Sequence, residues 1–72
     1  MKPNYVKFYS EIVKLFKAAE ANSTEGLDSL DRETIATQIS LNYGVTYEQV
    51  MAVLTNDLNV KEFTKKIYSY IK

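Results

Sequence analysis

The chain is 72 residues long, 46% of its residues are hydrophobic and 25% are charged, and nine basic residues balance nine acidic ones. This composition excludes a disordered chain, and the length predicts one domain over residues 1–72. The absence of Cys and His excludes disulfides, Cys/His zinc sites and catalysis by a histidine base.

The zero net charge conceals a sorting of charge along the chain. Residues 1–21 carry four Lys and two Glu, residues 22–59 carry one Arg and six acidic residues, and residues 60–72 carry four Lys and one Glu. The three segments sum to +2, −5 and +3. Both ends of the sequence are therefore basic and its middle is acidic.

The sequence carries no sign of a membrane or secretory protein. No apolar run approaches the roughly 18 residues of a membrane helix, and the N-terminus lacks the apolar core of a signal peptide. We therefore expect a cytoplasmic protein. Richness in Lys, Asn, Ile and Tyr favours an AT-rich genome, bacterial or phage.

The first predicted helix spans residues 4–21 and is the longest. Its apolar residues recur every three or four positions, as on one buried face of a helix; they are Tyr5, Phe8, Tyr9, Ile12, Leu15, Phe16 and Ala19. The opposite side carries Lys7, Ser10, Glu11, Lys14 and Lys17. A basic amphipathic helix can lie on a membrane surface, but so broad an apolar face favours burial in a core.

Residues 22–31 are polar and predict a loop. Leu27 and Leu30 are expected to anchor this loop to the core. The acidic residues in and after the loop do not follow the calcium-loop template and are better explained by helix capping, so no metal site is predicted.

Asp31 is predicted to cap a second helix over residues 32–43, with Leu30 and Ile35 as a hydrophobic staple. The buried side of this helix is expected to carry Ile35, Ala36, Ile39 and Tyr43. Leu41 falls on the opposite side, where we expect it to meet the first helix. A contact surface at Leu41 is the alternative.

The turn after the second helix has the clearest local signals in the chain. Gly44 can adopt the left-handed conformation that ends a helix, and Thr46 is a natural N-cap for a third helix over residues 47–56. Thr46 and Gln49 have the spacing of a capping box. The two helices are therefore joined by a turn of about three residues.

A fourth helix is predicted over residues 60–71, with Asn59 and Glu62 as a second capping box. Its apolar stripe consists of Val60, Phe63, Ile67, Tyr70 and Ile71. Tyr68 is expected to project from the other side, beside Lys61, Lys65 and Lys72.

Three helix starts share one pattern of a hydrophobic residue, a cap and a second hydrophobic residue, namely Leu30/Asp31/Ile35, Val45/Thr46/Val50 and Leu58/Asn59/Phe63. No segment alternates apolar and polar residues as a strand would. The sequence therefore predicts an all-α fold, a small four-helix bundle with one long N-terminal helix and three shorter ones.

The residue types present do not support catalysis. Familiar nucleophiles need a neighbouring base, most often His, and paired-carboxylate catalysis needs two acids in one cleft. Gly26 and Gly44 are the only glycines, and they lie too far apart to form a phosphate-binding loop. We predict a protein that is not an enzyme and binds no metal or cofactor.

Residues 36–54 combine a small residue at Ser40, a glycine at Gly44 and apolar residues at the buried positions Ile39, Val45, Val50 and Val53. This pattern resembles a helix-turn-helix, which implies that the third helix enters the DNA major groove. The charges disfavour this use, because no basic residue lies between Arg32 and Lys61 and DNA binding depends on phosphate contacts.

Residues 35–71 contain Tyr43-Gly44-Val45, then Leu54 ten residues after the glycine, then Asn59-Val60 at the start of the last helix. This pattern resembles the ubiquitin-associated-type three-helix module of ubiquitin receptors and of elongation factor Ts, with its Met-Gly-Phe or Thr-Gly-Ala turn. The chain departs from the family in a second loop one residue shorter and in a Phe where an Ala is usual. The resemblance implies a small three-helix module within the bundle.

We predict a non-enzymatic regulatory or adaptor protein that binds another protein through the turn between the second and third helices. The expected contact residues are Leu41, Tyr43, Val45 and Tyr47. Core packing is the alternative for Tyr43 and Val45, whose spacing fits the hydrophobic staple around the turn.

Two other functions stay open. One is a small helix-turn-helix DNA-binding regulator of bacterial or phage origin. It would be dimeric, so that its affinities for two weak half-sites combine, and it could use lysines of the first and last helices. The other is a homodimer in which Tyr68 and an exposed part of the first helix meet across a two-fold axis.

Overall fold

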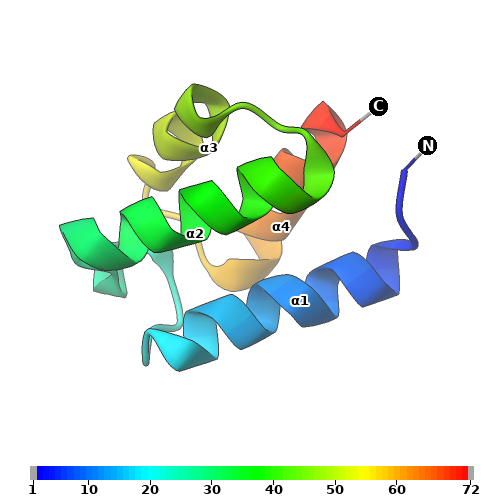
Figure 1. Cartoon of the computed structure of the whole chain (residues 1–72). Helices are drawn as coiled ribbons and strands as arrows, with labels where there is room; N and C mark the ends of the chain where they lie inside the picture. The colour runs from blue at the N-terminus through cyan, green and yellow to red at the C-terminus, as the bar shows by residue number, and fades with distance from the viewer. Residues whose placement is uncertain (1, 72) are drawn as a thin grey trace.

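Four helices are joined by three connections of unequal length (Figure 1). The computed structural model describes residues 2–71. Its elements are α1 (Tyr5–Ala18), the short 3₁₀ helix η1 (Thr24–Gly26), α2 (Ser29–Tyr43), α3 (Tyr47–Leu54) and α4 (Val60–Tyr70). Within the described range, β-type pairing is limited to an isolated bridge between Ser23 and Asn59. The predicted all-α fold of four helices is confirmed.

The helices pack as two neighbouring pairs, α1 against α4 and α2 against α3, with α3 also touching α4. α1 and α4 run antiparallel, because Phe16 packs on Phe63 at one end, with ring centroids 5.4 Å apart, and Tyr5 packs on Tyr68 at the other, at 4.9 Å. Figure 1 shows α2 passing in front of α4 and running above α1. The two basic helices are thus neighbours, and the acidic middle of the sequence forms the other half.

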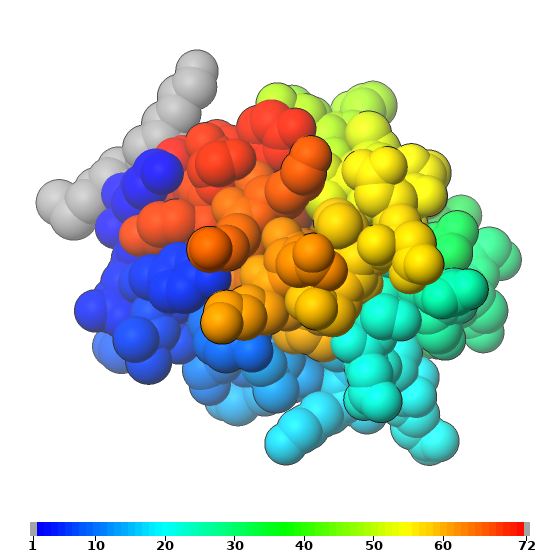
Figure 2. Space-filling view, turned by 180° about the vertical axis from the view of Figure 1, so that it is seen from behind, coloured from blue at the N-terminus to red at the C-terminus, as the bar shows by residue number. Residues whose placement is uncertain are grey.

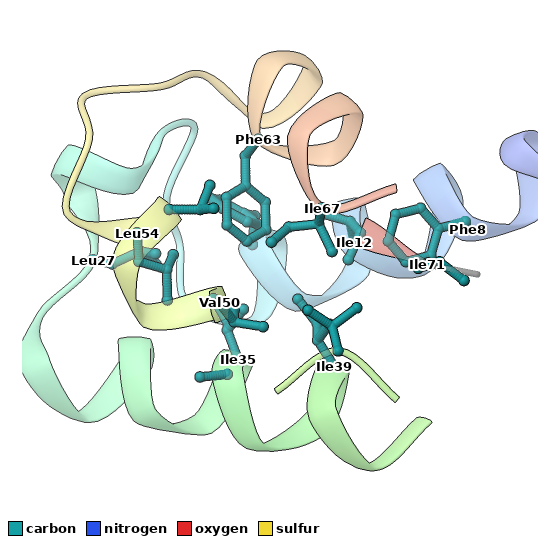
Figure 3. Packing of buried hydrophobic residues seen from close by; sticks show 14 residues of the cluster. Phe8, Ile12, Leu27, Ile35, Ile39, Val50, Leu54, Phe63, Ile67 and Ile71 are labelled. Atoms are coloured by element: carbon teal, nitrogen blue, oxygen red, sulfur yellow. The ribbon is translucent and has the colours of Figure 1, made fainter. Parts of the chain in front are cut away.

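The core is built from residues that repeat at helical spacing on every α-helix (Figure 3). Its buried members are Phe8, Ile12, Phe16, Leu27, Ile35, Ala36, Ile39, Val45, Val50, Val53, Leu54, Phe63, Ile67 and Ile71. Burying each of the larger side chains contributes roughly 1.5–3 kcal/mol. These contacts hold together four helices that would be unstable in isolation.

The first helix ends at Ala18, earlier than the predicted span of 4–21. With 14 residues it is shorter than α2, which has 15, so the prediction of one long N-terminal helix and three shorter ones is wrong. Glu20 adopts a left-handed backbone conformation with φ of 56°, and the Ala21 N–H donates a hydrogen bond to the Phe16 carbonyl at 3.0 Å. This geometry is a Schellman motif, which usually has glycine in the left-handed position. The sequence has glutamate there, so the helix end was not visible in it.

The second helix begins at Ser29, three residues before the predicted start of the span 32–43. Asp28 is its N-cap, because the Asp28 carboxylate accepts a hydrogen bond from the Asp31 N–H at 2.8 Å. The prediction that Asp31 caps this helix is therefore wrong. An additional backbone bond, from the Arg32 N–H to the Asp28 carbonyl at 3.0 Å, favours the longer helix.

The hydrophobic residue that anchors the start of α2 is Leu27 and not Leu30. Leu27 is buried, as predicted, whereas Leu30 exposes 68% of its surface. The predicted staple between Leu30 and Ile35 is therefore wrong. With the cap at Asp28, Leu30 lies inside the first turn, and the direction of the helix turns its side chain outward.

The other helix boundaries follow their local signals. Thr46 and Gln49 form the predicted capping box, with bonds of 3.1 and 3.2 Å, and Asn59 and Glu62 form the second one at 2.8 and 3.2 Å. Gly44 takes the left-handed conformation, with φ of 73°. α3 and α4 end within two residues of their predicted ends at 56 and 71.

The connection between α1 and α2 is tied to the connection between α3 and α4. Thr24, only 1% exposed, accepts a hydrogen bond at Oγ1 from the Leu58 N–H at 3.1 Å and donates one to the Asn56 carbonyl. The Thr24 N–H also donates to the Leu58 carbonyl at 2.8 Å. The predicted loop 22–31 is therefore an ordered segment, and its residues 29–31 belong to α2.

Tyr68 does not project away from the core as predicted. Its ring lies edge-on to Tyr5 at 4.9 Å and close to Phe8 at 5.5 Å, and its hydroxyl donates to the Pro3 carbonyl at 2.7 Å. Tyr68 therefore fixes the start of α1 to the end of α4. Lys72, expected beside it, lies outside the described residues.

Candidate protein-contact surface

The four residues predicted to form a contact patch occupy three different environments. Leu41 exposes 76% of its surface and Tyr47 exposes 38%, whereas Val45 exposes 2%. Val45 follows the left-handed Gly44, which reverses the chain and directs Val45 into the core. Val45 is thus a core residue and must be removed from the predicted patch.

Tyr43 fixes the end of α2 to α1. It is half-buried, and its ring meets Phe8 edge-on, with centroids 4.7 Å apart and an interplanar angle of 89°. Burial and, secondly, the Glu11 carboxylate raise the pKa of Tyr43 above its ordinary value of 10.0. Because the neutral form is favoured in the folded state, this contribution to stability is complete below pH 10 and is lost as the pH rises further.

Leu41 faces solvent and does not meet α1, contrary to the prediction. It is the last member of a row on the outer side of α2 with spacings of four, three and four residues, which place side chains on one helix face. We call this row the outer stripe; it consists of Leu30, Thr34, Thr37 and Leu41, all exposed.

One of the two hydroxyl groups of the outer stripe bonds within its own helix. The Thr34 hydroxyl donates a hydrogen bond to the Leu30 carbonyl at 3.0 Å. This internal bond satisfies the hydroxyl and leaves the Thr34 methyl group as the part available to a partner. The two leucines are separated by about 16 Å along the helix axis at 1.5 Å per residue, and Thr34 and Thr37 lie between them.

The sequence interpretation missed Leu30 as a surface residue. The signal was the helical spacing from Leu30 through Thr34 to Leu41. It became readable only once α2 was known to start before Leu30, since a helix beginning at residue 32 leaves Leu30 outside the row.

Tyr47 lies at the same end of α2 as Leu41, because it opens α3 directly after the turn. The capping box of Thr46 and Gln49 fixes the first turn of α3 and thereby the position of Tyr47. Tyrosine combines a large apolar ring with a polar hydroxyl and is common in protein interfaces. Leu41 and Tyr47 are therefore the two predicted contact residues that remain accessible.

The charges exposed on the α2–α3 half are acidic. Asp31 and Glu33 lie beside the outer stripe in sequence, and Glu48 lies in the first turn of α3. Arg32, the only basic residue of this half, is half-buried and donates from its guanidinium to the Thr24 carbonyl at 3.3 Å. Its charge is directed toward the connection between α1 and α2, and the surface near the stripe stays negative.

Residues 2–71 hold neither a metal-binding cluster nor a membrane-spanning helix. No group of three or more Asp, Glu, His or Cys residues in that range could hold a metal ion. None of the helices described there has the length and apolar character needed to cross a membrane.

No family model, curated protein or solved structure matches the chain. A function is therefore inferred from the surface of the molecule and its chemistry.

Proposed function

We propose that the protein is a non-enzymatic binding module that engages another protein through the outer stripe of α2 and through Tyr47. The observation that carries this proposal is the exposure of Leu30 and Leu41, 68% and 76%, on one face of one helix. A single exposed leucine is common on protein surfaces, whereas apolar residues aligned along a helix are typical of helix-mediated recognition.

The proposed contact lies on α2 and not on the turn itself. Val45 is buried and Tyr43 packs on Phe8, so the turn offers few free apolar atoms. Leu41 and Tyr47 flank the turn and remain available. The turn thus positions the contact residues, and the helix supplies them.

The chemistry of the partner follows from the charges around the stripe. Asp31, Glu33 and Glu48 make the exposed surface of this half negative, and complementary charge speeds association and selects the partner. The partner segment should therefore carry apolar side chains for Leu30 and Leu41, flanked by Lys or Arg. A basic amphipathic helix has this chemistry.

The proposal is tested by affinity capture from nuclease-treated host lysate, followed by titration of the purified captured protein by calorimetry. Leu41→Asp should weaken binding at least tenfold, because it places a charge in the proposed apolar contact. Ser10→Asp is the matched control, since it adds the same charge to the outer side of α1. Equal affinity for wild type and Leu41→Asp, with both folded by circular dichroism, would disprove the contact.

A helix-turn-helix DNA-binding regulator is the alternative suggested by α2, its short turn and α3. The outward side of α3 carries Glu48 and has no basic residue, although recognition helices lie among DNA phosphates. The charges therefore favour protein binding for this half of the molecule.

A further inference from the structure

The lysines of α4 divide between two sides of the helix. Tyr68 contacts Tyr5 and thereby marks the side of α4 that faces α1. Lys61 and Lys65 precede Tyr68 by seven and three residues, a spacing that places all three on one side. Lys66 instead shares its side with Glu62 and Tyr70, four residues before and after it.

α1 contributes a further lysine to the same boundary. Tyr5, Tyr9, Val13 and Lys17 follow one another at four-residue spacing, which forms a ridge along a helix. The ridge starts at Tyr5, which touches α4 and stacks on Tyr9 with centroids 6.3 Å apart. Because α1 and α4 are antiparallel, Lys17 and Lys61 lie at the same end of the pair. We call Lys17, Lys61 and Lys65 the lysine seam.

Among residues 2–71 the single ion pair joins Lys14 to Glu11, so no lysine of the seam is paired with a carboxylate there. After burial, the Glu11 carboxylate is the second cause that raises the pKa of Tyr43 on α2, and it lies 3.7 Å from Lys14, so Glu11 lies on the α2 side of α1. Glu62 accepts a hydrogen bond from the Asn59 N–H at 3.2 Å. Glu20 lies beyond the end of α1, and Glu25 and Asp57 belong to the two connections that Thr24 joins. The three lysines are all exposed. Figure 2 views the molecule from the side on which α4 lies next to α1.

We propose that the lysine seam binds the phosphate backbone of a nucleic acid. Lys61 and Lys65 are one helical turn apart, about 6 Å along the axis, so they can contact neighbouring phosphates. Tyr9, half-exposed on the same ridge, offers an aromatic ring on which an unpaired base can stack. This site lies on the helix pair opposite the outer stripe and is independent of the proposed protein contact.

An anionic membrane is disfavoured as the ligand. A helix that lies on a membrane inserts its apolar face among the lipids. The apolar face of α1 is committed to the core, where Phe8, Ile12 and Phe16 are buried. Outside the core, the pair exposes two large apolar side chains, Val6 and Tyr70, rather than the broad apolar face that insertion requires.

The test is fluorescence anisotropy of the full chain with two labelled probes, a DNA duplex of about 20 base pairs and a single strand of about 20 nucleotides. The salt concentration is varied between about 20 and 200 mM. Binding through three lysines should give a slope of log K against log salt of about −2 to −3. Lys65→Gln should weaken binding several-fold and reduce the slope by about one. Lys66→Gln removes the same charge from the adjacent residue and should leave both values near those of the wild type. Tighter binding of the single strand, lost in Tyr9→Ala, would support base stacking.

Four results would overturn the proposal. Equal losses for Lys65→Gln and Lys66→Gln would show a response to net charge and not to the seam. Absence of binding to both probes at about 20 mM salt would exclude the site. Preferential binding to phosphatidylserine vesicles would assign the site to a membrane. Salt-sensitive self-association without binding to either probe would mean that the acidic half of a second copy occupies the seam. Leu41→Asp should leave the affinity for nucleic acid unchanged, which separates this test from that of the protein contact.

Discussion

The two connections that flank α2 are held in place by different kinds of interaction. The short one, residues 44–46, uses neighbours in sequence: Gly44 ends α2 and the capping box of Thr46 and Gln49 starts α3. The long one, residues 19–28, depends on Thr24, whose partners Asn56 and Leu58 lie more than 30 residues away. Local chemistry is readable in a sequence, whereas such remote pairing emerges only when the chain folds.

The same contrast holds for the helix ends. Both connections begin near a left-handed residue, Gly44 with φ of 73° and Glu20 with φ of 56°. Glycine adopts this conformation without a Cβ penalty, whereas glutamate is strained there. The short connection has the residue that its geometry favours, and in the long connection the surrounding contacts impose the geometry.

The largest effect is expected from Thr24→Val, which keeps the shape of the side chain and removes the hydroxyl. The part-buried N–H of Leu58 and the carbonyl of Asn56 would each lose a partner, at a total cost of about 2–3 kcal/mol in the free energy of unfolding. Urea unfolding followed by circular dichroism measures this value.

Thr24→Ser is the matched control because it retains the hydroxyl and loses only a methyl group. It should cost about 1 kcal/mol. Equal losses for the two variants would show that packing, and not hydrogen bonding, holds the long connection.

Most of the fold could be predicted from the sequence because most of the interactions that determine it join residues close together in the chain. The helical spacing of the apolar residues and two capping boxes predicted four helices and their order. Tyr68 was misplaced because its partners, Tyr5 and the Pro3 carbonyl, belong to the far end of the chain. α1 was overextended because no glycine marks its end at Glu20.

The second prediction compares substitutions at the two residues with left-handed backbone conformation, Gly44 and Glu20. Gly44→Ala should lower the free energy of unfolding by about 1–2 kcal/mol, since an added Cβ would meet no atom within 4 Å and only backbone strain would act. Glu20→Gly should raise it by up to about 1 kcal/mol, because the Schellman motif then has its preferred residue. Thermal unfolding of both variants measures the two shifts, and a loss of stability in Glu20→Gly would mean that the glutamate side chain stabilises this end of α1.

The candidate site was less predictable than the fold because exposure depends on where each helix starts. Leu41 and Tyr47 were named from the sequence and are accessible, whereas Val45 proved to be buried by the direction of the turn. Leu30 was assigned to the core through a cap placed one turn too late. A shift of three residues at the start of α2 thus exchanges a core residue for a surface residue.

The smallest expected effect tests which residue caps α2 and therefore where α2 begins. Asp28→Ala removes the side chain that accepts the Asp31 N–H and should lower the free energy of unfolding by about 1 kcal/mol. Asp31→Ala removes only a charge in the first helical turn and should cost about 0.3–0.5 kcal/mol. Urea unfolding of the two variants side by side separates these values. The reverse order would place the cap at Asp31 and Leu30 before the helix, and the outer stripe would then lose one of its two leucines.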